Sequence, residues 1–115
     1  MNDRPIVVIT IGDPSGIGPE VTAKALADGE VYESCRPLVI GSKAVMEEAI
    51  RLVKGHLACR TVSSHGEVQG QPGEIDILDL ENLDLGKMQV GQISPEAGRA
   101  SMEWVLKAAE LCQTG

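Results

Sequence analysis

The sequence has almost no aromatic residues: of its 115 residues only Tyr32 and Trp104 are aromatic, and phenylalanine is absent. Because 43% of the residues are hydrophobic, the chain is still apolar enough to fold, and its core must be built from aliphatic side chains. Long apolar runs are also missing, since no stretch reaches the roughly 18 residues of a membrane-spanning helix. We therefore expect no membrane segment.

Positive charge and paired cysteines are scarce as well. Ten Lys and Arg residues stand against 17 Asp and Glu, giving a formal net charge of −7, whereas a nucleic-acid-binding surface needs clustered cations. Cys35, Cys59 and Cys112 are far apart and form no C-x-x-C motif, which indicates reduced thiols. The chain enters its first apolar run too early to leave room for a signal peptide. These features predict a cytoplasmic protein that binds neither nucleic acid nor membrane.

The most informative stretch runs from Ile6 to Glu20, IVVITIGDPSGIGPE. Its first six residues are apolar or β-branched without alternation, as in a parallel strand covered on both faces. A turn with three glycines follows, and Pro19 and Glu20 then suit the first turn of a helix. The stretch therefore predicts a strand, a sharp loop and a helix N-terminus, where open α/β sheets bind ligands.

Two interpretations of this loop remain open. Its glycines could present backbone N–H groups to a cofactor or an anionic substrate, or they could only form a tight turn. The loop lacks the Gly-Lys-Ser/Thr ending of a Walker A motif, and Val21 replaces the third glycine of a dinucleotide fingerprint. Asp13 and Glu20 disfavour a bare phosphate there, and Asp13 could bond its own turn, a ribose hydroxyl or a cation.

The rest of the chain alternates between strand and helix patterns, which predicts one α/β segment over residues 1–115 with a mostly parallel sheet. Ser42 is a plausible N-cap, and Lys54 followed by Gly55 should end the helix behind it. Strands are expected at 38–41, 57–62 and 75–80, and helices at 21–28, 43–54 and 94–113.

Several segments carry weaker expectations. Asp76 and Asp79 are expected at solvated positions of their strand, within an acidic patch that continues to Glu81 and Asp84. Residues 63–73 are expected to be a surface loop, and 83–92 remain unassigned. His56 and His65 are expected to be polar surface residues and not metal ligands.

The last helix, 94–113, is apolar over more of its circumference than one sheet face covers. Its polar residues fall on a single stripe, and nearly all the others are apolar or small. The pattern predicts a further partner surface, formed either by a second protomer or by additional polypeptide.

The Ile6–Glu20 stretch resembles the opening signature of the 4-hydroxythreonine-4-phosphate dehydrogenase family, TxGDPxGIGPE. A second similarity, weaker in sequence, includes Gly91, Gln92, Ser94 and Gly98 and the helix that follows. The matching signature residues are Thr10, Gly12, Asp13, Pro14, Gly16, Ile17, Gly18, Pro19 and Glu20.

This resemblance implies a three-layer α/β/α fold like that of isocitrate and isopropylmalate dehydrogenases, present here as an incomplete N-terminal part. It also implies a homodimeric enzyme that uses NAD and a divalent metal to oxidise a phosphorylated hydroxy acid such as 4-phosphooxy-threonine, with decarboxylation. The family's metal and phosphate ligands lie beyond the matched part, so this chain alone is expected to be inactive. A related four-carbon sugar-acid phosphate as substrate and a non-catalytic dimerisation module are the alternatives. By the same resemblance, the cofactor-binding residues are Gly12, Asp13, Pro14, Gly16, Ile17, Gly18 and Glu20.

Overall fold

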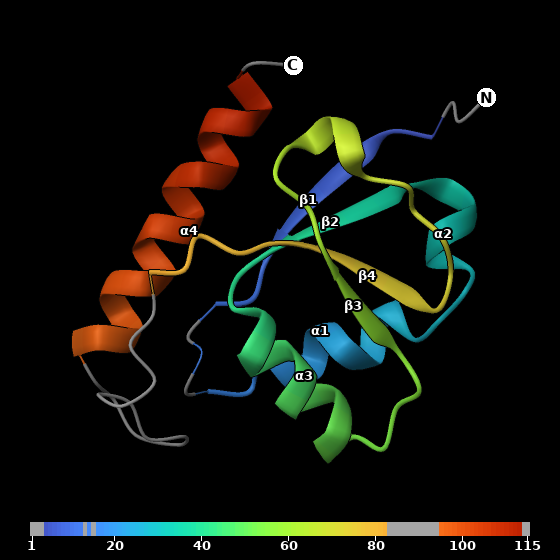
Figure 1. Ribbon diagram of the computed structural model, residues 1–115, viewed down its shortest axis with the longest axis horizontal. Coiled ribbons are helices and arrows are strands. Elements are labelled where there is room, and N and C mark those ends of the chain that lie inside the picture. Colours follow the sequence, from blue (N-terminus) through green and yellow to red (C-terminus); the bar gives the residue numbers. More distant parts are fainter. Residues whose placement is uncertain (1–3, 13, 15, 83–94, 114–115) are drawn as a thin grey trace.

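The computed structural model describes residues 4–12, 14, 16–82 and 95–113 and shows a four-stranded parallel sheet with helices around it (Figure 1). The strands are β1 (Ile6–Thr10), β2 (Arg36–Ile40), β3 (Ala58–Thr61) and β4 (Glu74–Leu78). They lie in the order β1-β2-β4-β3, and every pair is parallel. The α/β class and the parallel sheet predicted from the sequence are confirmed.

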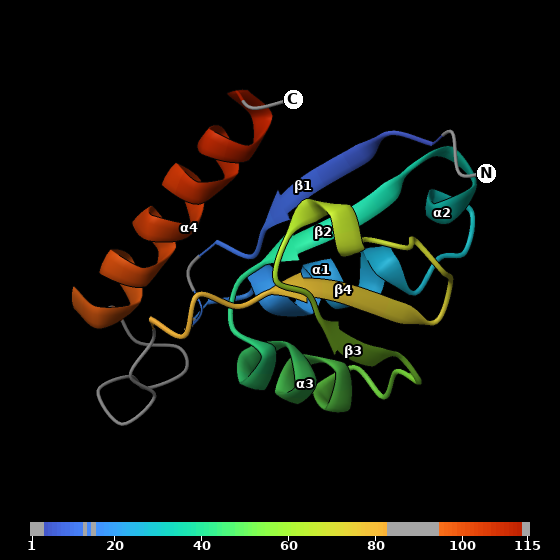
Figure 2. The same ribbon diagram turned by 45° about the horizontal axis from the view of Figure 1, so that its top comes forward.

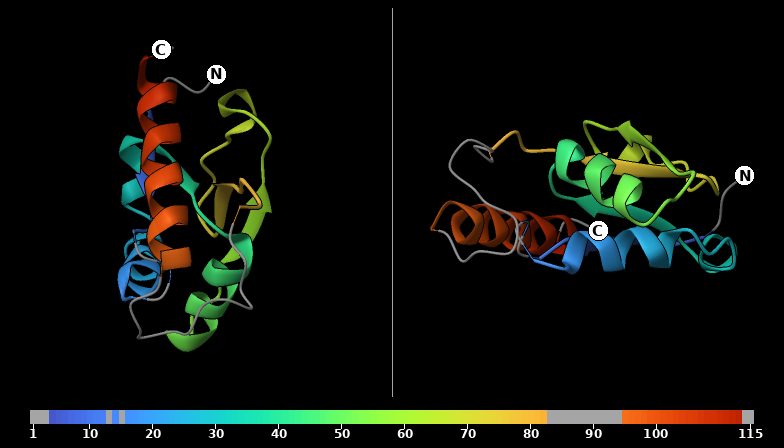
Figure 3. Two further views of the ribbon diagram at one scale, coloured as in Figure 1. Left: turned by 90° about the vertical axis from the view of Figure 1, so that its left-hand side faces the viewer. Right: turned by 90° about the horizontal axis from the view of Figure 1, so that it is seen from below.

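The helices are α1 (Gly18–Leu26), α2 (Val31–Ser34), α3 (Lys43–Leu52) and α4 (Pro95–Gln113), with a 3-10 turn η1 (His65–Glu67). Helices α1 and α3 pack against each other on one face of the sheet. This arrangement is expected, because right-handed crossovers that move along the sheet in the same direction place their helices on the same face. The η1 segment covers part of the opposite face (Figure 2). Helix α4 contacts β1 and β2 (Figure 3).

The core is aliphatic, as the composition requires. Its fully buried centre consists of Leu38, Val39 and Ile40 on β2 together with Ile75 and Ile77 on β4. Both aromatic residues are also buried. Trp104 joins α4 to this core, and the Tyr32 hydroxyl donates a hydrogen bond to the Glu74 carbonyl at 3.2 Å. Burial raises the pKa of Tyr32 to about 12, with Asp76 adding to the shift, so this hydroxyl stays protonated.

Strand β1 differs from its prediction, because it is not covered on both faces. Within the described residues it is the terminal strand of the sheet, and Val7 is 43% exposed. The apolar run fits an inner strand, but strand order depends on contacts that a local pattern does not contain. On α1, Thr22, Ala23 and Leu26 are buried, whereas Val21 is exposed.

Asp76 is buried, contrary to its expected place at a solvated position. Its carboxylate accepts hydrogen bonds from Arg60 Nε at 2.9 Å and from the backbone N–H groups of Gln69 and Gly70 at 3.0 and 3.2 Å. Residues 63–73 are therefore only partly the surface loop that was expected: Val68 and Gly70 are buried, and Asp76 orders the segment. The weakly patterned 83–92 stretch lies outside the described residues.

Helix α3 begins as predicted and ends differently. Ser42 is its N-cap and accepts a hydrogen bond from the Val45 N–H at 3.3 Å. At the other end Lys54, not Gly55, has the positive φ, 56°. The Gly55 N–H donates a hydrogen bond to the Ile50 carbonyl, and the Lys54 N–H donates one to the Arg51 carbonyl. These two bonds form a Schellman motif, in which lysine takes the position that is normally glycine.

Replacing Lys54 by glycine should raise the free energy of unfolding by about 1 kcal/mol, because only glycine adopts this backbone conformation without a steric cost. Urea unfolding followed by circular dichroism measures the change. The matched control is Lys24→Gly, in the last turn of α1, which should lower stability by up to about 1 kcal/mol. If both variants changed the free energy of unfolding in the same direction, the backbone at Lys54 would not be strained.

Asp76→Ala should lower the free energy of unfolding by about 3 kcal/mol, because it leaves the Arg60 guanidinium and two backbone N–H groups without their acceptor. Thermal unfolding measures the loss. The control Glu48→Ala removes a carboxylate from the exposed Glu48–Arg51 pair and should leave the stability nearly unchanged. A small effect at both positions would show that Asp76 does not hold the 63–73 segment.

Candidate functional site

The glycine-rich loop lies at the carboxyl end of β1 and leads directly into α1. Of its predicted cofactor-binding residues the structure describes Gly12, Pro14, Gly16, Ile17, Gly18 and Glu20, and Asp13 lies outside the described residues. Pro14 and Pro19 are buried and anchor the loop, whereas Gly16 is exposed and Ile17 is 75% exposed. The loop therefore presents its central residues to solvent at the sheet edge where α/β proteins bind ligands.

Two of the loop glycines have a definite geometric reason. Gly12 has φ +71°, a conformation that L side chains rarely adopt. A Cβ at Gly18 would lie 2.1 Å from the Ile11 carbonyl oxygen, so no side chain fits there. Gly41, which follows β2, also lies close to Ile11: a Cβ there would lie 2.7 Å from Ile11 Cδ1. Ile11 is thus held between the turns that follow β1 and β2.

The N-termini of α1 and α3 at this edge differ in how they are capped. At α3, Ser42 caps the helix and Asp79 accepts a hydrogen bond from the Lys43 N–H at 3.0 Å. At α1 the N-cap is Ile17, whose side chain makes no capping hydrogen bond. Of these two helices, α1 is therefore the one whose N-cap residue leaves the backbone donors of the first turn without a side-chain acceptor. Glu20 in its first turn still opposes a bare anion.

A polar network near the ends of β4 and α4 was not anticipated from the sequence. The Asn82 side chain accepts from Trp104 Nε1 at 3.0 Å and donates to Glu103 Oε1 at 2.5 Å. Arg99 pairs with Glu103 and Glu96 and donates to the Asn82 carbonyl. The network fixes α4 to the segment after β4. Trp104 was the available signal, because a buried indole N–H needs an acceptor.

The histidine and cysteine side chains of the described residues are dispersed. Within these residues no group of three or more His, Cys, Asp or Glu side chains gathers to hold a metal ion. His56 and His65 are exposed, in separate segments. Burial raises the pKa of Cys59 to about 11, so its thiol is protonated at neutral pH and is not an activated nucleophile. No helix in the described part of the chain is long and apolar enough to cross a membrane.

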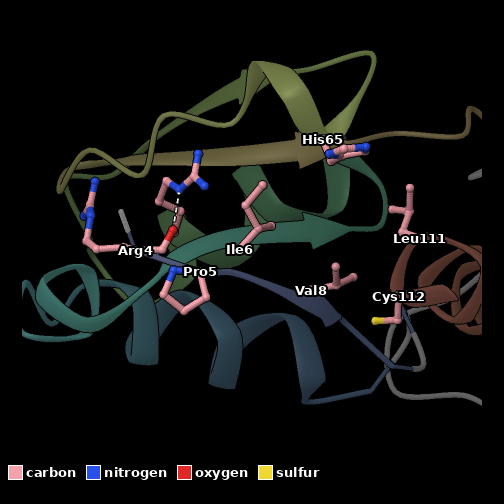
Figure 4. Close-up of a pocket in the computed structure, with 8 residues that line it drawn as sticks. Arg4, Pro5, Ile6, Val8, His65, Leu111 and Cys112 are labelled. Carbon is pink, nitrogen blue, oxygen red and sulfur yellow. Dashed lines mark hydrogen bonds between the residues drawn. The ribbon is translucent and has the colours of Figure 1, made fainter. Parts of the chain in front are cut away.

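A cavity of about 570 Å³ lies away from the loop, on the sheet face that η1 partly covers (Figure 4). Its floor is apolar and comes from β1, and the carboxyl end of α4 forms one wall. None of the predicted cofactor-binding residues borders it. The lining residues are Arg4, Pro5, Ile6, Val8, Arg36, His65, Leu111 and Cys112.

Gly18→Ala should destabilise the protein by about 3 kcal/mol, because its methyl group cannot fit against the Ile11 carbonyl unless the loop moves. Gly12→Ala should cost about 1 kcal/mol, since open space surrounds that position and only the positive φ is strained. Gly29→Ala is the control, with neither crowding nor a positive φ. Equilibrium unfolding of the three variants tests this order, and a neutral Gly18→Ala would refute the close approach.

Comparison with known proteins gives one consistent answer. The family model described as "Pyridoxal phosphate biosynthetic protein PdxA" matches residues 33–115. Two curated relatives align over all 115 residues, one from Symbiobacterium thermophilum at 40% identity and one from Clostridium botulinum at 36%; both are provisionally named D-threonate 4-phosphate dehydrogenase.

Among solved structures, a 4-hydroxythreonine-4-phosphate dehydrogenase from Burkholderia phymatum superposes with a TM-score of 0.92 at 38% identity. The alignment covers 99% of this chain and 34% of that one. The chain likewise spans 34% of the length of both curated relatives. The PdxA model, these relatives and the superposed fold agree, and the chain belongs to the PdxA family.

Proposed function

We propose that this chain is the N-terminal part of an NAD- and divalent-metal-dependent dehydrogenase that oxidises a four-carbon phosphorylated hydroxy acid. The observation that carries the proposal is the glycine-rich loop at the carboxyl end of β1, in a chain that belongs to the PdxA family. Because 34% of the relatives' length is present, most of the active site is expected outside these 115 residues. The chain alone should therefore be inactive.

The loop residues suit a part of the cofactor that carries no negative charge. Gly18 must remain without a side chain, Gly16 and Ile17 are exposed, and the α1 N-terminus has no side-chain cap within the described residues. Glu20 and the net charge of −7 disfavour the pyrophosphate, so we assign the loop to the nicotinamide end of NAD. When bound, NAD supplies the hydride acceptor, and this loop orients it.

The metal has no fitting site in the described residues. Its ligands and the basic residues for the substrate phosphate are expected in the remaining part of the fold.

Two substrates fit the proposal. The relatives' names point to D-threonate 4-phosphate, whereas the Burkholderia phymatum structure's name points to 4-hydroxythreonine 4-phosphate. D-threonate 4-phosphate is a four-carbon sugar-acid phosphate, which is the substrate class given above as an alternative to 4-phosphooxy-threonine. Since the identities are nearly equal, direct assay must choose between the two.

Helix α4 supports a further protein contact, which we assign to a homodimer of the complete enzyme. Its inner face is buried at Ala97, Ala100 and Trp104. Its outer face carries exposed Met102, Val105 and Leu106, the last 62% exposed. A non-catalytic dimerisation module would use the same face.

The enzymatic proposal is tested by joining residues 1–115 to the remaining two-thirds of the Symbiobacterium thermophilum relative. We expect NADH formation with one of the two substrates and a divalent metal, and none from the 115-residue chain. In the chimera, Gly16→Val should raise the KM for NAD at least about tenfold, because it places a branched side chain in the exposed cofactor loop.

The control is Gly29→Val, which adds the same side chain in open space outside the loop and should leave the KM for NAD unchanged. Unchanged kinetics for Gly16→Val would reduce the loop to a structural turn. Turnover by the 115-residue chain, with its mass verified, would refute the fragment proposal. A stable dimer of that chain without NAD binding would favour the dimerisation module.

A further inference from the structure

The segment 64–72, which we call the strap, connects β3 to β4 across the sheet face opposite α1 and α3 (Figure 2). The connections from β1 to β2 and from β2 to β3 contain α-helices of nine and ten residues, whereas the strap contains the three-residue turn η1. Of the strap residues, all of which the structure describes, Val68 and Gly70 are buried and the others are exposed. The strap therefore has little apolar burial and little secondary structure of its own to hold it.

Side chains from other elements hold the strap through its backbone. Four successive carbonyl groups of the strap accept hydrogen bonds from three guanidinium groups. The pairs are Arg60 with Glu67, Arg36 with Val68 at 3.4 Å, and Arg4 with Gln69 and Gly70 at 3.3 and 3.0 Å. The last two of these peptide units also donate their N–H groups to the Asp76 carboxylate. The three arginines and Asp76, which we call the clamp, come from β2, β3 and β4 and from the segment just before β1.

The clamp side chains also bond one another, so their contacts with the strap are interdependent. Arg60 donates to Asp76 Oδ1 at 2.9 Å as well as to the strap. Arg36 donates from Nε to the Arg4 carbonyl at 2.8 Å and from Nη1 to the strap. Both strap N–H groups that Asp76 binds reach the same oxygen, Oδ2. Because hydrogen bonds in such a network strengthen one another, the loss of one contact weakens the rest, and the strap should be released as a unit.

Within the described residues, the ladder bonds of the sheet do not involve the strap. The bonds between β3 and β4 nearest to it run from the Ala58 N–H to the Gly73 carbonyl at 3.0 Å and from the Val62 N–H to the Ile77 carbonyl at 2.9 Å. All four of these residues lie outside 64–72. The strap can therefore leave the sheet while every strand pairing remains, and the conformational entropy that it regains offsets part of the cost.

The strap also forms part of the cavity wall. His65 of the strap and Arg4 and Arg36 of the clamp line the cavity, above the floor that Ile6 and Val8 provide (Figure 4). The clamp thus supplies polar lining to the cavity and at the same time holds the strap in place. Release of the strap would remove one wall and expose the apolar floor to solvent.

We propose that the strap is a movable wall of this cavity, which opens as a unit while the sheet and its helices stay folded. In the closed state the clamp binds the strap backbone and Val68, 4% exposed, is its apolar anchor. In the open state the strap carbonyls and N–H groups bond water, Val68 leaves its buried position, and the cavity widens. Because the clamp binds backbone groups, it closes the strap with little dependence on the strap's own side chains.

Native-state hydrogen exchange of the 115-residue chain tests whether the strap opens separately. The amides of Gln69 and Gly70 should exchange at least about 100-fold faster than those of Val39 and Ile77 in the sheet, although Asp76 accepts a hydrogen bond from both. Equal protection of the two groups would show that the strap opens only when the whole fold does, and would overturn the proposal.

Arg4→Met removes one guanidinium group of the clamp and leaves the strap sequence intact. The amides of 67–70 should then exchange together at least about tenfold faster, with those of 75–77 in β4 unchanged. The matched control is Arg51→Met, which removes an exposed guanidinium group from α3 and should change neither set. Faster exchange at only the two amides bound to Asp76 would mean residue-by-residue fraying, and faster exchange throughout β4 would mean that Arg4 holds the whole fold. Either result would overturn the proposal.

Gly70→Ala tests the link between the strap and the cavity, because it loosens the strap without changing a residue that lines the cavity. Gly70 has φ +66°, and a Cβ there would lie 2.5 Å from Arg36 Cγ, so the strap cannot close fully. The variant should bind the apolar dye anilinonaphthalene sulfonate at least about threefold more strongly than the parent chain. The control is Gly66→Ala, whose Cβ would meet only Ser64 Oγ at 3.8 Å and should leave dye binding unchanged. Equal dye binding by Gly70→Ala and the parent chain would overturn the strap's role as a cavity wall.

Discussion

Ile11 holds together the two turns on which this edge of the sheet depends. Its carbonyl lies against Gly18 at the start of α1, and its side chain lies against Gly41 after β2. Neither contact leaves room for a Cβ, so the turns after two neighbouring strands are fixed relative to each other through one buried residue. The exposed part of the loop at Gly16 and Ile17 is thereby carried on a rigid base, which a ligand-binding loop requires.

The elements of the fold could be predicted from the sequence because their signals are local. The apolar run before Gly12, the cap at Ser42 and the periodicity of α4 each identify an element from neighbouring residues. The errors concern contacts between distant segments. Asp76 appeared solvated because its donors come from Arg60 and from a loop whose path has no sequence signature. At Lys54, the backbone takes the positive φ one residue before Gly55, where the local rule places it.

The candidate site shows the same division. The signature residues located the loop and its helix, but spacing alone could not show that Gly18 touches the Ile11 carbonyl while Gly12 lies in open space. The exposed side of β1 also could not be predicted, because an apolar run specifies burial and not which neighbour provides it. The family comparison supplies the missing context, since the chain spans 34% of the curated relatives' length.

The insertion of β4 between β2 and β3 has a consequence for synthesis on the ribosome. The chain makes β2 and β3 first, yet the two strands do not pair with each other, and each waits for residues 74–78. In a nascent chain, the backbone N–H and C=O groups on one side of β2 therefore lack strand partners until β4 has been translated. Four β2 residues that are buried in the folded protein lack this cover during that interval, which makes this the stage of biogenesis at which chaperone binding would protect the polypeptide best.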